Sequence, residues 1–237
     1  MSHIVITGGG TGVGAEIAHA VAATGAKVTI MGRREAPLRE QGLPFQTCDV
    51  TDPEAVQAAF AAARAENGPI TGVVANAGAA HSAPFHKITA QDITDMMAVN
   101  VTGVFNVWQA ALAEMKEAGQ GRLIAVASTA GLKGYPYVAG YVAAKHGVVG
   151  LTKNAAMEYA KSNIRVNAVC PGGVHTNMTE TAEKEIPGFL DKLAKHEPMG
   201  RLAEPEEIAS AVVWLCSDGA SFMTGHALAV DGGFVAR

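Results

Sequence analysis

The stretch that decides the fold lies at the start of the chain and reads His3-Ile4-Val5-Ile6-Thr7-Gly8-Gly9-Gly10-Thr11-Gly12-Val13-Gly14. Its first five residues are mostly apolar and β-branched and predict a strand, and apolar helical spacing follows over residues 15–24. The glycines permit a tight turn, and the helix start offers free N–H groups and a positive dipole end to a pyrophosphate. The stretch therefore predicts a strand, turn and helix that bind a dinucleotide, with a purely structural glycine turn as the alternative.

The rest of the chain repeats this alternation of strands and helices. Its length of 237 residues suits one large domain. We expect an α/β fold, a single-domain Rossmann-type doubly wound parallel sheet with helices on both faces. Residues 1–237 form one dinucleotide-binding and catalytic domain, in which the polar segment 177–200 is a substrate lid. Strands are expected at 3–7, 27–31, 45–50, 70–75, 123–128, 165–169 and 227–230, and helices at 15–24, 53–66, 92–119, 141–160 and 205–216.

Composition and charge exclude several classes of binding partner. The net charge is −4, and the chain has no Lys/Arg cluster longer than Arg33-Arg34, which argues against nucleic acid. The three cysteines have no metal-ligand spacing, so we predict reduced thiols, no metal and a cytoplasmic location. No apolar run approaches ~18 residues, and no leader precedes the first strand, so we expect a soluble protein without a membrane partner.

Tyr141 and Lys145 carry the clearest chemical pattern. If they lie on a helix, the phenol and the ammonium are one turn apart on the same face, and the cation would lower the pKa of the phenol. Ser128 follows an apolar strand, where its hydroxyl could reach the same reacting atom. A serine donor, a tyrosine acid/base and a lysine fit carbonyl reduction or alcohol oxidation. A solvated Tyr/Lys pair is the alternative.

The end of the second expected strand bears on the choice of cofactor. An acidic residue there would bind an adenosine ribose, but Gly32-Arg33-Arg34 stand in its place. Arg33 therefore favours NADP(H) over NAD(H), with a solvated loop cation as the alternative. The Asp49-Val50 pair suits an adenine, and the small residues of Asn76-Ala77-Gly78 would let a ribose approach the backbone.

In these motifs the chain resembles the short-chain dehydrogenase/reductase family over nearly its whole length. The resemblance implies that Tyr141 is the general acid/base and that Lys145 lowers its pKa and binds the nicotinamide ribose. Ser128 would polarise the carbonyl, and Asn100 would hold a water that relays protons to Lys145. It also implies a homotetramer in which the helices bearing Asn100 and Tyr141 pack between subunits. The expected cofactor-binding residues are Gly8, Gly10, Thr11, Gly12, Val13, Gly14, Arg33, Asp49, Val50, Asn76, Ala77, Gly78, Tyr141, Lys145, Pro171, Gly172, Val174 and Thr176.

The segments 128–145 and 198 onward most resemble the 3-oxoacyl-thioester reductases of this family, which act on acyl carrier protein or CoA thioesters. The leading hypothesis is an NAD(P)H-dependent oxidoreductase of a ketone or secondary alcohol, namely a 3-oxoacyl-thioester reductase that prefers NADPH. One alternative is an NAD-dependent dehydrogenase of a cyclic or polyol secondary alcohol. Another is a non-catalytic nucleotide-binding or sensing protein, although the complete set of catalytic residues argues against it.

Overall fold

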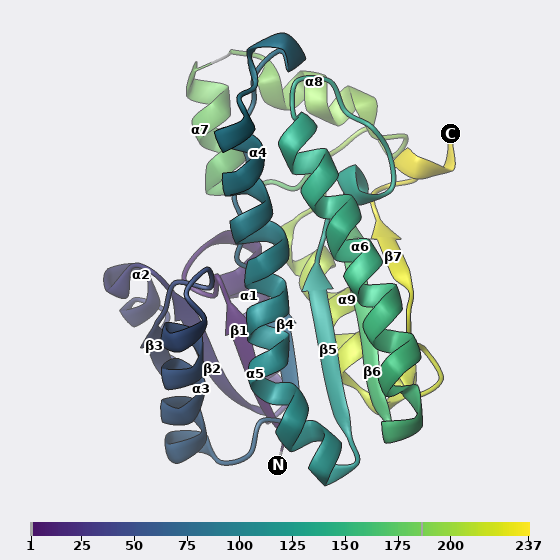
Figure 1. Ribbon diagram of the computed structural model, residues 1–237. Helices are drawn as coiled ribbons and strands as arrows, with labels where there is room; N and C mark the ends of the chain where they lie inside the picture. Colours follow the sequence, from purple (N-terminus) through teal and green to yellow (C-terminus); the bar gives the residue numbers. More distant parts are fainter. Residues whose placement is uncertain (1, 186) are drawn as a thin grey trace.

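A computed structural model describes residues 2–185 and 187–237, so Met1 and Ile186, which lies within the expected lid, fall outside the described residues. The described residues form a seven-stranded parallel sheet in the order β3-β2-β1-β4-β5-β6-β7 (Figure 1). This confirms the predicted doubly wound α/β fold. The strands are β1 (His3–Thr7), β2 (Lys27–Gly32), β3 (Phe45–Thr47), β4 (Gly72–Ala75), β5 (Gly121–Val126), β6 (Ile164–Pro171) and β7 (Ala227–Val230).

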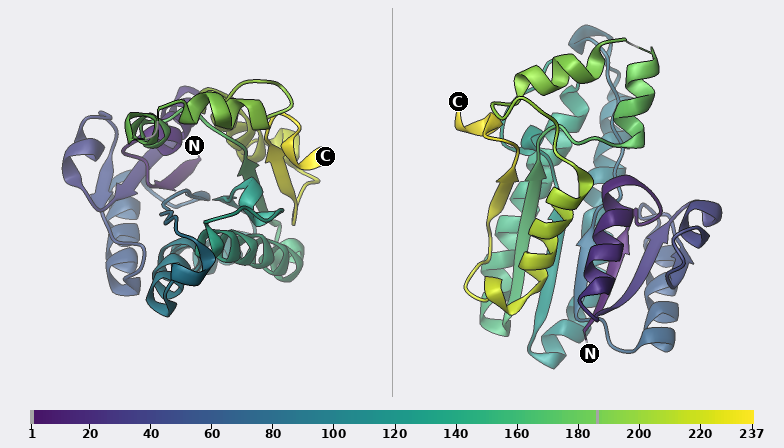
Figure 2. Two further views of the ribbon diagram at one scale, coloured as in Figure 1. Left: turned by 90° about the horizontal axis from the view of Figure 1, so that it is seen from above. Right: turned by 180° about the vertical axis from the view of Figure 1, so that it is seen from behind.

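Helices cover both faces of the sheet. Helices α3 (Pro53–Asn67), α5 (Gly103–Ala118) and α6 (Ala139–Tyr159) pack on one face, and α1 (Gly12–Ala23) and α9 (Pro205–Cys216) on the other (Figures 1 and 2). All of β1 is therefore buried, and Val5 joins one core cluster while Ile4 and Ile6 join the other. Burial on both faces explains why the strand is apolar at nearly every position instead of alternating.

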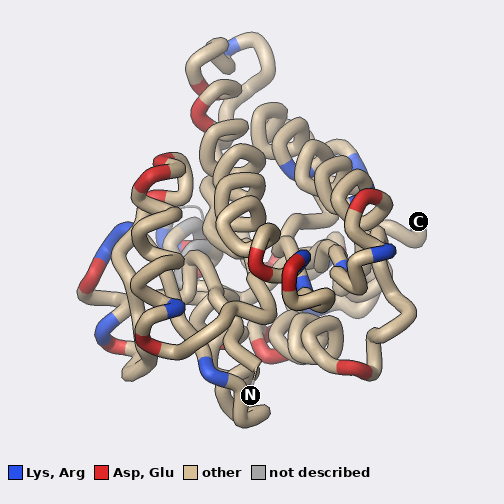
Figure 3. Tube along the Cα trace, turned by 60° about the horizontal axis from the view of Figure 1, so that its bottom comes forward, with Lys and Arg blue, Asp and Glu red and all other residues tan. Residues whose placement is uncertain are grey.

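Most charged residues lie on the surface, outside this core. Figure 3 shows Lys and Arg interspersed with Asp and Glu along the tube instead of gathered on one element. A protein with two apolar layers and dispersed surface charges needs few charged residues, which agrees with the 17% in the sequence.

Five expected strands differ from the structure at their ends. Strand β2 runs one residue beyond 27–31, β5 covers 121–126 instead of 123–128, and β6 covers 164–171 instead of 165–169. The strand expected over 45–50 stops at Thr47, because the Asp49 carboxylate accepts hydrogen bonds from the Thr51 backbone N–H (2.9 Å) and hydroxyl (2.8 Å). Such a turn takes the chain out of the sheet, so Asp49 stands in a loop. The strand expected over 70–75 is the shorter β4. Helix α2 (Glu35–Arg39) was not expected.

The helix expected over 92–119 is interrupted. It consists of α4 (Ala90–Met97), a π-helical turn (Ala98–Thr102) and α5. Together they make one run, Ala90–Ala118, the only helix of the described residues long and apolar enough to cross a membrane. Core helices pass the same test, and half of the apolar window is buried within this fold.

The segment 177–200 contains two helices, α7 (Asn177–Glu185) and α8 (Phe189–His196). Both lie beyond the arrowheads of the strands, at the top of Figure 1, and the view from above in Figure 2 shows them crossing the molecule there. The carboxyl edge of a doubly wound sheet is where such folds bind ligands. The segment therefore lies above the edge at which a site is expected.

Candidate active site

A cavity of about 900 Å³ runs along the carboxyl edge of the sheet. It extends from the glycine loop and Arg33 at one end to His196 and Phe234 at the other, and its size is that of ordinary ligand sites. The structure brings every expected site residue to its wall. These are Gly8, Gly10, Thr11, Gly12, Val13, Gly14, Arg33, Asp49, Val50, Asn76, Ala77, Gly78, Asn100, Ser128, Tyr141, Lys145, Pro171, Gly172, Val174 and Thr176.

The glycine loop is shaped by close contacts between backbones. A Cβ atom at Gly14 would lie 2.2 Å from the Gly8 carbonyl oxygen and 2.4 Å from Asn76 Nδ2, so no larger residue fits. Asn76 Nδ2 donates to the carbonyl oxygens of Thr7 (3.1 Å) and Gly8 (3.3 Å), which ties the loop to the end of β4. Within the described structure the Thr11 side chain makes no capping hydrogen bond, so the first N–H groups of α1 remain free for an anion. This cradle fits a dinucleotide pyrophosphate.

The adenosine end of the cavity carries two cations. Arg33 and Arg34 follow β2 and line the wall, together with Asp49. Hydrogen bonds from Thr51, the backbone N–H first, hold the pKa of Asp49 below its usual value, and Arg33 adds to this effect. Arg34 was missed as a site residue, although its position beside Arg33 was a signal that could have found it.

The π-helical turn places Asn100 beneath the cavity. Its side chain is fully buried, and Nδ2 donates to the carbonyl oxygens of Ala79 (2.9 Å) and Met96 (3.1 Å). A Cβ atom at Gly78 would lie 2.8 Å from Asn100 Oδ1, which explains the glycine of the Asn-Ala-Gly motif. The lengthened turn alters the normal bonding of the helix, and such turns are frequent at functional sites. Asn100 thus joins α4 and α5 to the loop after β4.

Ser128, Tyr141 and Lys145 converge at the middle of the cavity. Tyr141 and Lys145 both lie on α6, and the ammonium is 5.5 Å from the centroid of the phenol ring. Lys145 is 5% exposed, and Nζ donates to the Val126 carbonyl oxygen at 2.9 Å, at the end of β5. The Ser128 hydroxyl lies near enough to the Tyr141 phenol to lower its pKa. Helix α6 and the loop after β5 thus supply the three groups from separate parts of the chain.

Burial is the main influence on the pKa of both Tyr141 and Lys145. It raises the pKa of the phenol, and the Ser128 hydroxyl offsets part of that rise. It lowers the pKa of Lys145 to about 8. The effect of Lys145 on the acidity of the phenol stays a prediction.

The wall at the far end of the cavity is built by residues outside the catalytic and cofactor motifs. Tyr135 stacks on Phe234, with ring centroids 5.4 Å apart, and its hydroxyl shares a hydrogen bond of 2.5 Å with Thr129. His196 and Glu197, at the end of α8, line the same end. These residues come from three separate segments, so no local spacing could have grouped all of them.

Comparison with known proteins identifies the family. Residues 8–235 match the family described as Enoyl-(Acyl carrier protein) reductase, and the chain is 38% identical over 234 residues to an acetoacetyl-CoA reductase of Rhizobium meliloti. That match covers 97% of this chain and 96% of the relative. The chain belongs to the short-chain dehydrogenase/reductase family. Within this family it is also 39% identical over 241 residues to a 2,5-dichloro-2,5-cyclohexadiene-1,4-diol dehydrogenase of Sphingobium indicum, covering 98% of the chain and 96% of the relative.

Solved structures of the family agree with this assignment. A gluconate 5-dehydrogenase of Burkholderia cenocepacia in complex with NADP and tartrate matches with a TM-score of 0.92 and 32% identity, covering 100% of this chain and 96% of the other. The protein is therefore an oxidoreductase that acts on CH–OH groups or the matching carbonyls with a nicotinamide cofactor. The glycine cradle fits that cofactor.

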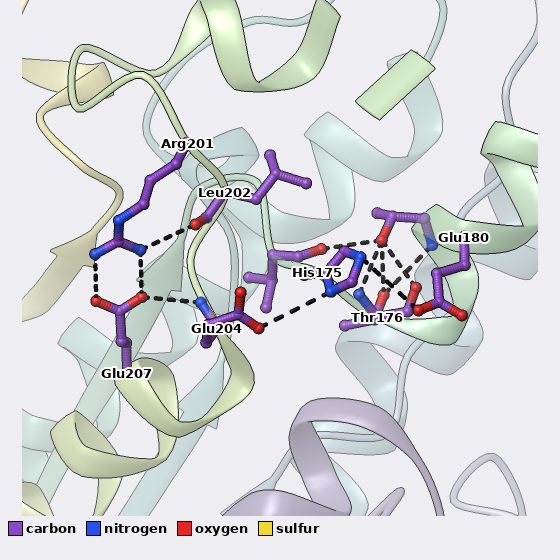
Figure 4. A network of polar contacts seen from close by, with 9 residues as sticks. His175, Thr176, Glu180, Arg201, Leu202, Glu204 and Glu207 are labelled. Atoms are coloured by element: carbon purple, nitrogen blue, oxygen red, sulfur yellow. Dashed lines mark hydrogen bonds and ion pairs between the residues drawn. The ribbon is translucent and has the colours of Figure 1, made fainter. Parts of the chain in front are cut away.

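A polar network fastens the start of the segment 177–200 to the family fold (Figure 4). His175 lies between two carboxylates, with Nε2 3.8 Å from Glu180 on α7 and Nδ1 3.9 Å from Glu204, which precedes α9. Arg201 donates two hydrogen bonds to Glu207, of 2.7 and 2.8 Å. These bonds are the main reason why the pKa of Glu207 is lowered to about 2. Charged and partly exposed side chains thus link α7 to α9.

Proposed function

We propose that this protein is a reductase of 3-oxoacyl thioesters that prefers NADPH. The observation that carries the proposal is the convergence of Ser128, Tyr141 and Lys145 in one cavity with the glycine cradle. The acetoacetyl-CoA reductase relative supports a thioester substrate. The far end of the cavity has aromatic and apolar walls, including Tyr135, Leu193 and Phe234, which suit an acyl chain.

In this proposal each residue of the site has a defined role. The bound nicotinamide supplies the hydride for the carbonyl carbon. Tyr141 donates its phenolic proton to the carbonyl oxygen, and the Ser128 hydroxyl donates a hydrogen bond that stabilises the developing negative charge. Lys145 holds the nicotinamide ribose and keeps a positive charge beside the phenol. Asn100 positions the loop after β4 and holds a water that passes protons to Lys145.

The acidity of Tyr141 supports reduction at neutral pH. Because burial raises the pKa of the phenol, the proton needed for reduction is in place. Alcohol oxidation needs the phenolate as a base, so the oxidation rate should rise with pH toward the pKa of Tyr141.

The cofactor preference rests on Arg33, with Arg34 beside it. Both guanidinium groups line the cavity after β2, where the sequence has no acidic residue until Glu35. Guanidinium groups bind phosphate with paired hydrogen bonds, so an adenosine 2′-phosphate suits this position. The NADP complex of the gluconate 5-dehydrogenase supports this preference.

A second candidate is an NAD-dependent dehydrogenase of a cyclic or polyol secondary alcohol. The observation that favours it is the similarity to a cyclic diol dehydrogenase, which at 39% identity is as high as that to the thioester reductase at 38%. The same Ser128 and Tyr141 geometry serves either substrate, since both reactions move a proton at one oxygen.

The test measures NADPH and NADH oxidation with acetoacetyl-CoA under identical conditions. We expect NADPH to be oxidised faster, and crotonyl-CoA, an enoyl thioester without a ketone, to give no reaction. Tyr141→Phe should lower turnover by about 10²–10⁴-fold while NADPH binding is retained. Oxidation with NADH alone, or activity only on a cyclic diol, would favour the second candidate.

The same proposal includes a homotetramer. Large apolar side chains stand exposed on two sides of the chain, Phe105 on α5 and Met157 on α6, and Trp214 on α9 with Phe222 beyond it. Met157 is 84% exposed and Phe222 fully exposed, which is costly unless another copy covers them. Two such faces are what a dimer of dimers requires. Light scattering of the purified protein should give four times the mass of the chain.

Two further expectations belong to the proposal. The segment 177–200 acts as a lid, since α8 supplies Leu193 and His196 to the cavity wall. The cytoplasmic location is supported by Cys48, Cys170 and Cys216, all of which are free thiols, as a reducing compartment maintains them.

A further inference from the structure

Glu197 is a buried carboxyl group that the proposed reaction does not use. It directly follows α8, at the point where the segment 177–200 returns to the body of the protein, and it is 6% exposed. Oε1 accepts a hydrogen bond of 2.8 Å from the Gly173 backbone N–H. Oε2 is buried and has no hydrogen-bond partner among the described residues. A buried carboxyl with one free oxygen is costly, so its position needs a reason.

The partner of Glu197 belongs to the cofactor site. Gly172 and Gly173 follow the end of β6, and both line the cavity. A Cβ atom would lie 3.0 Å from Glu197 Oε1 if placed at Gly172 and 3.2 Å if placed at Gly173. These two glycines therefore leave room for the carboxyl group to approach the turn.

The same turn is attached to the body of the fold from the other side. Gly172 N donates to the Val230 carbonyl oxygen of β7 at 3.1 Å, and Met199 N, two residues after Glu197, donates to the Gly232 carbonyl oxygen at 3.2 Å. The end of the lid segment and the turn after β6 are thus held against the same stretch after β7. Glu197 is the side chain that joins them directly.

We propose that Glu197 is a positioning residue that ties the base of the lid to the Gly172–Gly173 turn and so fixes this part of the wall of the cofactor cavity. This inference rests on the proposed function for the role of the lid. Glu197 acts through Gly173, by accepting a hydrogen bond from its N–H. An uncharged amide oxygen can accept the same hydrogen bond.

Burial favours the neutral form of Glu197. Burial first, and then Asp231, raise the pKa of Glu197, while the Gly173 N–H, Arg237 and His196 oppose that rise. Burial first, and then Glu197 and Asp231, raise the pKa of Tyr135. Because the folded pKa of Glu197 is raised, its buried position is most stable below the ordinary glutamate pKa, and this stability is lost as pH rises through the raised value. Glutamine at this position should remove that dependence.

The experiment compares E197Q, E197A and E197D with D191A, which removes an exposed carboxylate of α8. The readouts are the NADPH dissociation constant, measured by fluorescence without any ketone, and kcat and KM for acetoacetyl-CoA. We expect E197A to raise the dissociation constant and KM about tenfold each, with a smaller loss in kcat. E197D, whose carboxyl is one methylene short of Gly173, should be impaired in the same direction. E197Q and D191A should stay within about twofold of wild type.

The pH dependence supplies the second readout. The NADPH dissociation constant of the wild type, divided by that of E197Q, should rise with pH. Titration of the cofactor phosphate affects both proteins equally and therefore cancels in this ratio. If E197A had a lower melting temperature but an unchanged dissociation constant and KM, the proposal would be overturned, because that is the behaviour of a residue that only stabilises the fold. Impairment of E197Q equal to that of E197A would overturn it as well. Since NADPH binding is measured without a ketone, it tests Glu197 even if acetoacetyl-CoA proves not to be the substrate.

Discussion

The two ends of the cavity are built in different ways. The cofactor end consists of backbone in close contact, as at Gly8 and Gly14, with Asn76 as the clamp. The lid end is held by side chains, many of them charged and partly exposed, such as His175 with Glu180. Close packing fails when a single atom is added, whereas polar contacts at the surface are individually weak and depend on pH and salt. The first end should be intolerant of substitution and the second adjustable.

The largest effect should come from Gly14→Ala at the cofactor end. The new Cβ atom would lie 2.2 Å from the Gly8 carbonyl oxygen, so the loop must shift. We expect a loss of about 1–3 kcal/mol in the free energy of unfolding and no measurable NADPH binding. Thermal unfolding and a binding titration check this, with Ala23→Ser at the exposed end of α1 as the control. If Gly14→Ala bound NADPH normally, the cofactor end would not be intolerant of substitution, and the contrast with the lid end would fail.

Arg33→Ala should have the next largest effect. Loss of a charge-assisted hydrogen bond to phosphate costs about 1.5–3 kcal/mol, so the KM for NADPH should rise about 10–100-fold while that for NADH changes little. Arg39→Ala is the matched control, since it removes the same charge from the exposed surface of α2 outside the cavity. An unchanged KM for NADPH would make Arg33 a solvated loop cation and favour NAD(H).

A smaller effect is expected at the lid. Glu183 accepts backbone hydrogen bonds from Gly188 (2.8 Å) and Leu190 (2.7 Å), and these bonds lower the pKa of its carboxyl. Glu183→Ala should loosen the start of α8 and raise the KM for the ketone a few-fold, without changing NADPH binding. Steady-state kinetics and a separate NADPH titration measure the two effects. An equal change in both would mean that the two ends do not behave independently.

The smallest effect is expected at Glu207, whose pKa is lowered to about 2 by Arg201. Because the folded pKa lies below the unfolded one, the pair stabilises the protein above the ordinary glutamate pKa of about 4.3, and this contribution is lost as pH falls toward 2. The melting temperature of Glu207→Gln should therefore be slightly below wild type at neutral pH, and the difference should vanish in acid. A difference that persists below about pH 3 would point to packing instead of charge.

Part of this architecture followed from local sequence. The apolar run before the glycine loop and the alternation of strands and helices predicted the doubly wound fold, which the structure confirms. The motif residues all line one cavity, because the carboxyl ends of parallel strands meet at one edge. The π-helical turn at Asn100 and the contribution of Phe234 could not be predicted, since neither has a distinctive local pattern.

The sequence by itself determined which residue types stand at the strand ends, because the signals for strands, turns and helices are local. The glycines that close backbone contact requires can also be read directly from the sequence. Only the tertiary structure decided how those residues behave. It showed that burial raises the pKa of Tyr141 and lowers that of Lys145, and that Glu197 lies against Gly173, 24 positions away in the chain. Desolvation and long-range contact depend on what surrounds a group in three dimensions, and spacing along the chain does not contain that information.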